Sequence, residues 1–364
     1  MSLRLGIVGL PNVGKSTVFN ALTKAGAQVA NYPFCTIEPN VGIVPVPDPR
    51  LRKLAELYRP GKITPATVEF VDIAGLVKGA SAGEGLGNQF LGHIKEVDAI
   101  LHIVRCFEDP DVVHVSGKIN PASDIEVIQT ELCLKDLETV TQRAQKLEKT
   151  AKSGDKTAQQ ALAVVQRAKQ LLEDGLPVRK GNWTKEELPF LDELQLLTQK
   201  PVLYGANVNE KDLPEGGAFV DLVRARAEKE GARVAVICGK VEAEVSELNQ
   251  EEAREYLKAF SLTESGLDQL IRLSYGLLGL VTFLTAGETE VRAWTIIKGM
   301  KAPQAAGVIH SDFERGFIRA EVMAYEDLVR YGSQQAVKEK GMYRLEGKEY
   351  QVKDGDVIYF RFNV

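Results

Sequence analysis

The stretch that decides the fold is Gly9-Leu-Pro-Asn-Val-Gly-Lys-Ser16, near the start of a chain of 364 residues. It has the Gly-x-x-x-x-Gly-Lys-Ser spacing of a phosphate-binding loop, between an apolar run at residues 3–8 and a helix-like segment at residues 18–24. The glycines let backbone N–H groups face an anion at a helix N-terminus, where the helix dipole also favours negative charge. A glycine-rich turn with a chance Lys-Ser pair is the alternative. The flanking strand and helix favour a nucleotide site on an α/β fold.

Side chains of this loop predict how a nucleotide and a metal ion are held. Lys15 is expected to reach the β- and γ-phosphates, and Ser16 is expected to give its hydroxyl to Mg²⁺. The predicted nucleotide-binding residues of the loop are Asn12, Val13, Gly14, Lys15, Ser16 and Thr17.

A second motif, Val68-Glu-Phe-Val-Asp-Ile-Ala-Gly75, places an acid at the end of another apolar strand. Asp72 is predicted to hold Mg²⁺ through its water shell, and the backbone N–H of Gly75 is predicted to approach the γ-phosphate. Lys15 and Gly75 are therefore assigned to catalysis. Thr36, between the two motifs, is the third predicted Mg²⁺ ligand when a triphosphate is bound, and an ordinary turn threonine is the alternative.

Strand-like and helix-like segments alternate through the first third of the chain, which is typical of a mostly parallel sheet covered by helices. The same α/β pattern resumes at residues 201–207 and 233–238. Between these parts the period changes. Apolar or small side chains recur every three or four residues at Leu137, Val140, Ala144, Leu147 and Ala151, and again at Ala158, Ala161, Val165, Ala168 and Leu172. With a turn at residues 152–156, this spacing predicts an inserted antiparallel helical hairpin.

The chain is predicted to have three parts. Residues 1–130 and 199–281 form the P-loop NTPase domain, and residues 131–198 form the inserted helical arm. Residues 282–364, rich in short strand-like runs and glycine-containing turns, form a small α+β domain. The arm can be a lever that grips a partner or a scaffold hairpin, and both readings stay open.

The composition excludes several classes. The longest apolar runs fall far short of the roughly 20 residues that a membrane helix needs, and the N-terminus lacks the pattern of a signal peptide. A cytosolic protein without membrane contact is expected. The net charge of −5 argues against a general nucleic-acid coat. Four widely spaced cysteines fit neither a disulfide scaffold nor a zinc site, and are interpreted as structural thiols.

These motifs resemble the YchF/Obg-like ATPase family of translation-factor-class P-loop GTPases. The resemblance rests on both motifs above and on Asn31-Tyr-Pro-Phe-Cys-Thr-Ile-Glu-Pro-Asn40, Asn207-Val-Asn-Glu210, Val291-Arg-Ala-Trp-Thr295 and Ala302-Pro-Gln-Ala-Ala-Gly307. It implies a Ras-like domain, a coiled-coil arm, and a C-terminal TGS domain of ubiquitin-like fold. It further implies nucleotide hydrolysis by a monomer and association with the ribosome, as the large subunit or the 70S particle, with RNA as a further candidate partner.

The base-reading motif departs from the ordinary Asn-Lys-x-Asp of GTPases. Val208 stands where the lysine stem would cover the base, and Glu210 where aspartate would accept two hydrogen bonds from guanine. Losing a bidentate contact can remove roughly 1 to 3 kcal/mol of discrimination. Guanine specificity is therefore expected to weaken, and the resemblance points to ATP, with GTP as the alternative nucleotide. Asn207, Val208 and Glu210 are the predicted nucleotide-binding residues on the base side, with Asn207 bonding the base edge and Val208 offering an apolar face.

Leu76 stands where many GTPases carry a glutamine that orients the attacking water. Slow intrinsic hydrolysis is therefore expected until a partner or a loop completes the site. The glycine-rich segment at residues 76–87 is expected to become ordered when a γ-phosphate is present. Asn12 is in the position where leucine-bearing relatives can hold a potassium ion.

His114 is the candidate base, because it lies in a loop-like stretch after a strand and an imidazole titrates near neutral pH. The other three histidines receive structural interpretations: His102 as a core residue, His93 on a helix, and His310 in a local hydrogen bond. Two other functional classes stay open beside the NTPase. One is a nucleotide-sensing RNA- or ribosome-binding module with incidental turnover. The other is a small-molecule kinase, for which no acceptor-site signature is present.

Overall fold

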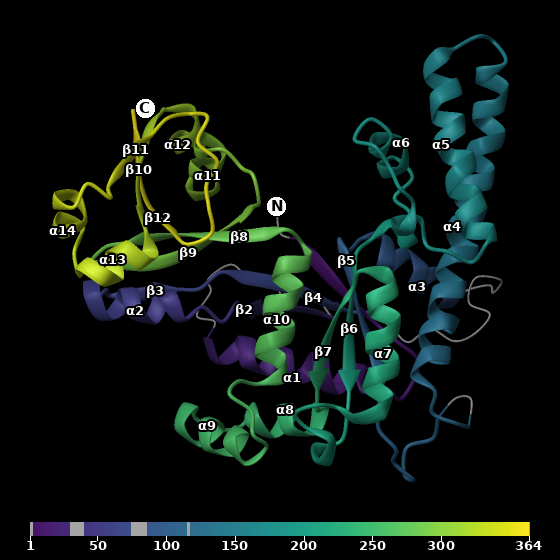
Figure 1. Cartoon of the computed structure of the whole chain (residues 1–364), viewed down its shortest axis with the longest axis horizontal. Helices are drawn as coiled ribbons and strands as arrows, with labels where there is room; N and C mark the ends of the chain where they lie inside the picture. The colour runs from purple at the N-terminus through teal and green to yellow at the C-terminus, as the bar shows by residue number, and fades with distance from the viewer. Residues whose placement is uncertain (1–2, 30–39, 74–85, 115–116, 364) are drawn as a thin grey trace. The chain divides into compact units, whose positions relative to one another are not determined.

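Residues 3–29, 40–73, 86–114 and 117–363 are described by the computed structural model of the chain (Figure 1). The chain divides into two units, one made of Met1–Ile43 and Glu69–Ser274 and the other of Val44–Val68 and Tyr275–Val364. Three residues with predicted roles, Thr36, Gly75 and Leu76, lie outside the described residues.

The sheet of the first unit carries the phosphate-binding loop, and its strand order is β2-β4-β1-β5-β6-β7. Strand β1 pairs in parallel with β4 and β5, β5 with β6, and β6 with β7, which confirms the predicted parallel sheet. Every residue of β5 is buried, as expected for a strand covered on both faces. The six strands are β1 (Arg4–Val8), β2 (Val41–Pro45), β4 (Thr67–Asp72), β5 (Ala99–Arg105), β6 (Val202–Asn207) and β7 (Arg233–Ile237).

Helices alternate with these strands along the chain. The principal ones are α1 (Lys15–Val29), α3 (Leu86–Lys95), α7 (Gly217–Glu230), α8 (Gly239–Val245), α9 (Gln250–Ala259) and α10 (Gly266–Leu277), with a short 3₁₀ turn η3 (Glu210–Asp212) after β6. Because the strands are parallel, their carboxyl ends and the loops that follow them meet at one edge of the sheet.

A helical hairpin stands out from the first unit, with α4 (Pro121–Ala151) and α5 (Lys156–Glu173) side by side (Figure 1). The predicted seam residues form its core, with Leu137 and Ala151 partly buried at the edge of that core, which confirms the hairpin. Asp155 caps the start of α5 by accepting hydrogen bonds from two backbone N–H groups. Helix α4 begins at Pro121, ahead of the predicted arm boundary at residue 131, because the Asn120 side chain caps it and Pro121 suits a first helical turn. The domain boundaries themselves stay a prediction.

Buried hydrogen bonds tie α4 to the return end of the arm. Asp136 is 1% exposed, and its carboxylate accepts from the backbone N–H groups of Leu197 at 2.9 Å and Thr198 at 2.7 Å. It also accepts from the Thr198 hydroxyl at 2.7 Å. Both partners belong to the short turn η2 (Leu197–Gln199), and two further short helices, η1 (Val178–Lys180) and α6 (Leu188–Asp192), lie between α5 and η2 in the chain. One buried side chain therefore fixes the position of η2 against α4.

Replacing Asp136 by alanine is expected to lower the free energy of unfolding by about 2 to 4 kcal/mol, since two buried N–H groups lose their acceptor. Hydrogen exchange should accelerate at the Leu197 and Thr198 amides, while denaturant titration measures the total loss. Glu148→Ala, at an exposed position of the same helix, is the matched control. Equal stability of the two variants would contradict the assigned anchor.

The second unit contains a sheet with the order β11-β10-β12-β8-β9-β3. An antiparallel pair β8–β9, an antiparallel pair β10–β12 and a parallel pair β12–β8 build its centre, which confirms the predicted small α+β unit. Its core includes Phe283, Phe317 and Phe360. The strands are β8 (Leu280–Ala286), β9 (Glu290–Ile297), β10 (Phe317–Ala324), β11 (Arg344–Glu346) and β12 (Asp356–Phe362). The helices are α11 (Ala302–Ile309), α12 (Ser311–Arg315), α13 (Tyr325–Tyr331) and α14 (Gln334–Glu339).

A segment from the first third of the chain completes this second unit. Strand β3 (Lys62–Thr64) pairs in parallel with β9, and helix α2 (Pro49–Tyr58) precedes it. The Arg50 guanidinium, which also bonds Asp48, donates to Asp354 at 2.8 Å. From sequence, this whole segment is predicted to belong to the NTPase domain, because a strand of three residues carries no detectable alternation.

Within the described ranges, no helix has the length and apolarity to cross a membrane. Cys106, Cys133 and Cys238 are free and buried. Burial raises the pKa of the Cys106 and Cys133 thiols to about 12. A thiol that stays protonated is a poor nucleophile, which agrees with the predicted structural role.

Candidate nucleotide-binding site

The phosphate-binding loop connects β1 to α1, as its spacing predicts. Asn12 (φ 61°) and Gly14 (φ 95°) have left-handed backbone conformations, which turn the chain tightly before the helix begins at Lys15. A Cβ atom at Gly14 would collide with the side-chain amide of Asn207. Glycine is therefore required at position 14 both by the backbone conformation and by the close approach of Asn207.

Lys15, at the end of the loop, and Asp72, at the end of β4, are the charged pair of the phosphate site. Lys15 is 8% exposed, and its ammonium group donates to the Leu10 carbonyl at 2.8 Å. Burial lowers the pKa of Lys15, and the charge of Asp72 opposes that shift. Burial likewise raises the pKa of the Asp72 carboxyl, and Lys15 opposes it. The two side chains therefore sense each other's charge, as expected if one faces phosphate and the other a cation bound to it.

Ser16 and Thr17 lie exposed in the first turn of α1, where backbone N–H groups lack helical partners. Thr17 lines the adjoining cleft. Val13 is buried, and its carbonyl accepts a hydrogen bond from the Asn207 side chain. The remaining predicted phosphate and metal contacts, Thr36 and Gly75, fall outside the described residues.

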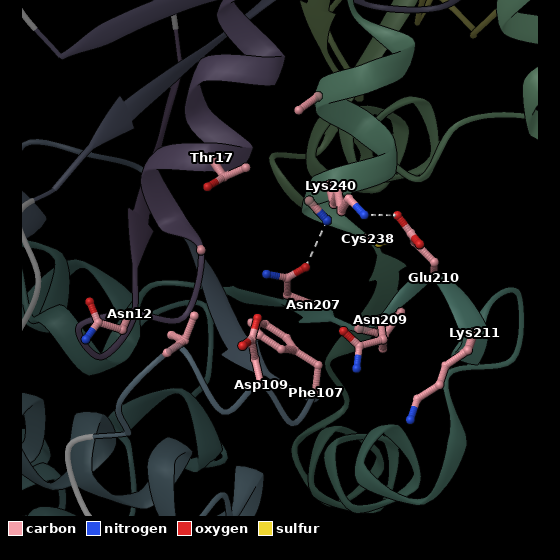
Figure 2. A pocket seen from close by; sticks show the side chains of 15 residues that line it. Asn12, Thr17, Phe107, Asp109, Asn207, Asn209, Glu210, Lys211, Cys238 and Lys240 are labelled. Atoms are coloured by element: carbon pink, nitrogen blue, oxygen red, sulfur yellow. Dashed lines mark hydrogen bonds and ion pairs between the residues drawn. The ribbon is translucent and has the colours of Figure 1, made fainter.

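A cleft of about 770 Å³ opens beside the loop (Figure 2). Its walls come from the phosphate-binding loop, the segment after β5, the segment after β6 and the start of α8. They include the predicted residues Asn12, Gly14, Thr17, Asn207, Val208 and Glu210. They also include Phe107, Asp109, Val112, Asn209, Lys211, Cys238, Gly239, Lys240 and Ala243, which the sequence analysis did not assign.

Several of the unassigned wall residues could have been predicted from their positions directly after strands. Phe107 follows the end of β5, and Cys238 to Lys240 follow the end of β7. Residues after the carboxyl ends of neighbouring parallel strands gather at one edge, so their positions after these strands place them there. Motif spacing alone misses them, because apart from Asn209, the variable position of the base-reading motif, they lie outside the phosphate- and base-reading signatures.

Asn207 is a structural link between two walls of the cleft. Its side-chain nitrogen donates to the Val13 carbonyl at 3.0 Å. Its side-chain oxygen accepts from the Gly239 N–H at 2.9 Å (Figure 2). The residue is 5% exposed. The amide thus holds the phosphate-binding loop against α8, and its expected bond to a base edge stays a prediction.

Val208 and Glu210 lie on the same wall. Val208 is 3% exposed, and its N–H donates to the Ile237 carbonyl, which leaves an apolar lining. The Glu210 carboxylate forms an ion pair of 2.8 Å with the Lys240 ammonium (Figure 2). The Lys240 side chain is 70% exposed, so the ion pair contributes little to stability. Lys240 nevertheless pairs with the Glu210 carboxylate, which occupies the position that reads guanine in other GTPases.

The loop before His114 is held in place from three sides. The buried Arg105 guanidinium donates to the carbonyls of Phe107 at 3.1 Å, Asp109 at 3.3 Å and Val112 at 3.0 Å. The Asn12 amide donates to the Val113 carbonyl at 3.2 Å, so the loop lies directly beside the phosphate-binding loop. His114 itself is 9% exposed, with Nε2 at 2.9 Å from the Asp124 carboxylate.

The other histidines fit their structural interpretations. Burial lowers the pKa of His102 in β5 to about 3, so the ring is neutral in the core. His310 accepts a hydrogen bond from the Asp312 N–H at 3.2 Å. His93 is exposed on α3.

Comparison with known proteins decides the family. The chain is 57% identical over 366 residues to the ribosome-binding ATPase YchF of Bacillus subtilis, with full coverage of both chains. It is 56% identical over 364 residues to the protein of the same name from Haemophilus influenzae, again with full coverage. The chain belongs to the YchF family. The solved structure of the Schizosaccharomyces pombe YchF GTPase covers 99% of this YchF-family chain, with 98% of its own length matched, 41% identity and a TM-score of 0.90.

Two family models match separate parts of this YchF-family chain. Residues 4–142 match a model described as a 50S ribosome-binding GTPase. Residues 280–363 match the YchF GTPase C-terminal model, described as a protein of unknown function (DUF933). The chain is thus a P-loop NTPase with a long helical hairpin and a family-specific C-terminal unit, which confirms the predicted fold class and family.

Proposed function

We propose that this chain is a Mg²⁺-dependent ATPase that acts as a cytoplasmic nucleotide switch on the ribosome. The observation that carries the proposal is the phosphate-binding loop, with Lys15 coupled to Asp72, beside a cleft whose guanine-reading carboxylate is diverted to Lys240. Relatives that match over their full length are named ribosome-binding ATPases. The chain is proposed to act as a monomer, with the ribosomal large subunit or the 70S particle, and RNA within it, as the partner.

The described residues suit a magnesium ion held mainly by phosphate and water. Mg²⁺ at nucleotide sites keeps several waters and takes only one or two protein oxygens beside the phosphates. Asp72 lies at the end of β4 and Ser16 in the first turn of α1, while no group of three acidic, histidine or cysteine residues gathers in the described chain. Ser16, Asp72 and Thr36 would hold the ion, and the ion would neutralise charge that develops on the phosphates.

The base preference follows from the cleft wall. Val208 presents an apolar surface in place of a charged lysine stem, and Glu210 is longer than the aspartate that forks onto guanine. Adenine offers no pair of donors equivalent to guanine N1 and N2, so it loses nothing from the missing fork. ATP is therefore proposed to bind at least as well as GTP.

Changing Glu210→Asp together with Val208→Lys is expected to raise the affinity for GTP relative to ATP by roughly tenfold, since it restores the fork and the stem over the base. Titration of this double variant and of the parent with ATP and with GTP measures the ratio of the two affinities. Glu215→Asp, an exposed site outside the cleft, controls for the change of carboxylate length. A parent chain that strongly prefers GTP would overturn the adenine assignment.

Hydrolysis is proposed to be slow in the isolated chain. Leu76 has no group that orients water, so Lys15 and Gly75 would stabilise the transferred phosphate while the base comes from elsewhere. His114 is the proposed base, because its loop bonds Asn12 of the phosphate-binding loop through Val113. Asn12 is also the proposed ligand if a potassium ion supplements Mg²⁺.

A second function is supported by the same features. The arm and the C-terminal unit suit a nucleotide-sensing ribosome-binding module in which turnover is incidental. Measuring ATP turnover with and without ribosomes, beside ribosome pelleting in each nucleotide state, separates the two functions. Pelleting that depends on the bound nucleotide without stimulated turnover would favour the second.

A further inference from the structure

Asp124 connects the loop of His114 to the longest helix of the chain. It lies in the first turns of α4, its side chain is 6% exposed, and its Oδ2 atom is 2.9 Å from His114 Nε2. We propose that Asp124 is a positioning residue, which orients the His114 imidazole and couples it through α4 to the arm. The proposal deepens the proposed function, because it rests on His114 acting as the base.

The contact with Asp124 selects one tautomer of the imidazole. An ionised carboxylate only accepts hydrogen bonds, so the proton of a neutral His114 must lie on Nε2. Nδ1 then keeps its lone pair and is the atom able to accept a proton from water. Burial raises the pKa of Asp124, while the hydrogen bond to His114 and the charge of Arg105 oppose that rise and favour the ionised form.

The immediate surroundings restrict the imidazole further. Arg105 holds three carbonyls of the preceding loop, and Asn12 holds the carbonyl of Val113. These contacts hold the backbone of the loop. Asp124 approaches the ring from α4, and its contact with Nε2 constrains how the ring is turned.

Helix α4 extends from this contact into the arm without interruption. At 1.5 Å per residue, Asp124 and the C-terminal end of α4 are roughly 40 Å apart. Gln129 of α4 accepts from Arg226 of α7 at 2.8 Å and donates to the Gly175 carbonyl at 3.1 Å. Further along α4, the Asp136 carboxylate accepts hydrogen bonds from the backbone of η2. Force on the arm would therefore act on a helix with fixed points, and the first of them along the chain is the Asp124 contact.

Asp124→Asn is the variant that tests the proposal, because it keeps the side-chain volume while adding a donor that can face Nε2. Glu126→Gln, at an exposed position two residues along the same helix, makes the same chemical change away from His114. Each variant is compared with the parent in three assays. Nitrogen-15 NMR of the histidine rings reports the tautomer, with the His114 signals assigned by their loss in His114→Ala. Single-turnover hydrolysis is followed with and without 70S ribosomes. ATP and ribosome affinities are measured separately.

The parent should show His114 protonated at Nε2, and Asp124→Asn should shift that tautomer balance. Ribosome-stimulated turnover should fall about tenfold in Asp124→Asn, with ATP and ribosome affinities within about twofold of the parent, because only the transition state needs the oriented ring. In the double variant with His114→Ala, turnover should be no lower than in His114→Ala alone. Glu126→Gln should behave as the parent.

Two results would overturn the positioning role. One is an unchanged His114 tautomer in Asp124→Asn, and the other is parental turnover in Asp124→Asn while His114→Ala is impaired. Parental turnover in His114→Ala would instead reject His114 as the base, and the tautomer measurement would still judge Asp124. If Asp124→Asn does not fold, Asp124→Glu replaces it, because this variant keeps the charge and displaces the carboxylate. Asp124→Glu should lower stimulated turnover in the same assay. Parental turnover in Asp124→Glu would count against the proposal.

Discussion

Lys15→Ala should weaken Mg²⁺–ATP binding by at least about 100-fold, since a charge-assisted hydrogen bond to phosphate contributes roughly 1.5 to 3 kcal/mol and Lys15 is expected to reach two phosphates. The structure adds a second reason, because Lys15 is the positive charge that opposes the neutralisation of Asp72. Without it, the pKa of the Asp72 carboxyl would rise further and its hold on Mg²⁺ would weaken. Ser16→Ala is expected to reduce Mg²⁺-dependent affinity by the loss of a metal ligand.

Calorimetric titration with ATP in the presence of Mg²⁺ measures this loss, and circular dichroism checks the fold. Lys24→Ala is the matched control, because Lys24 lies on the same helix and is 57% exposed. Lys15 is 8% exposed and its ammonium group bonds the Leu10 carbonyl, so a modest drop in stability is compatible with the assignment. Parental affinity in the Lys15 variant would remove the phosphate-binding loop from the account.

His114→Ala is expected to lower ribosome-stimulated single-turnover hydrolysis by about 100-fold, the lower end of the contribution of general bases. ATP affinity should stay within about twofold of the parent, because the imidazole faces Asp124 and acts on the transition state rather than on the bound nucleotide. The large loss in rate with constant affinity distinguishes a base from a residue that only shapes the cleft.

Rapid mixing of ribosome-bound protein with ATP isolates this step from product release. His93→Ala, an exposed histidine on α3, controls for the general effect of removing an imidazole. Parental single-turnover rates in His114→Ala would exclude the residue from the mechanism and direct attention to groups supplied by the ribosome.

The phosphate site could be predicted from sequence because its chemistry is local. Eight consecutive residues specify the loop, and the strand before it and the helix after it are short-range features. The arm could be predicted for a similar reason, since a seam that repeats every three or four residues records the packing of two adjacent helices. Both predictions depend on contacts between residues that are close in sequence or follow a strict period.

The features that sequence could not supply depend on long-range packing. Strand β3 is only three residues long and joins a partner more than 200 positions away, Glu290 to Arg292. Lys240 reaches Glu210 because β6 and β7 are neighbours in the sheet. Asp124 reaches His114 because α4 begins where the loop ends, and a lone aspartate in the first turn of a helix is ordinarily explained by the helix dipole.

The rate of ATP hydrolysis by the parent chain, measured with Mg²⁺ over a series of 70S ribosome concentrations, tests the central claim most directly. We expect a low rate without ribosomes and a rise that saturates as the complex forms, because the ribosome completes a site in which Leu76 cannot orient water. A rate that stays the same at every ribosome concentration, while pelleting shows that the complex has formed, would contradict it.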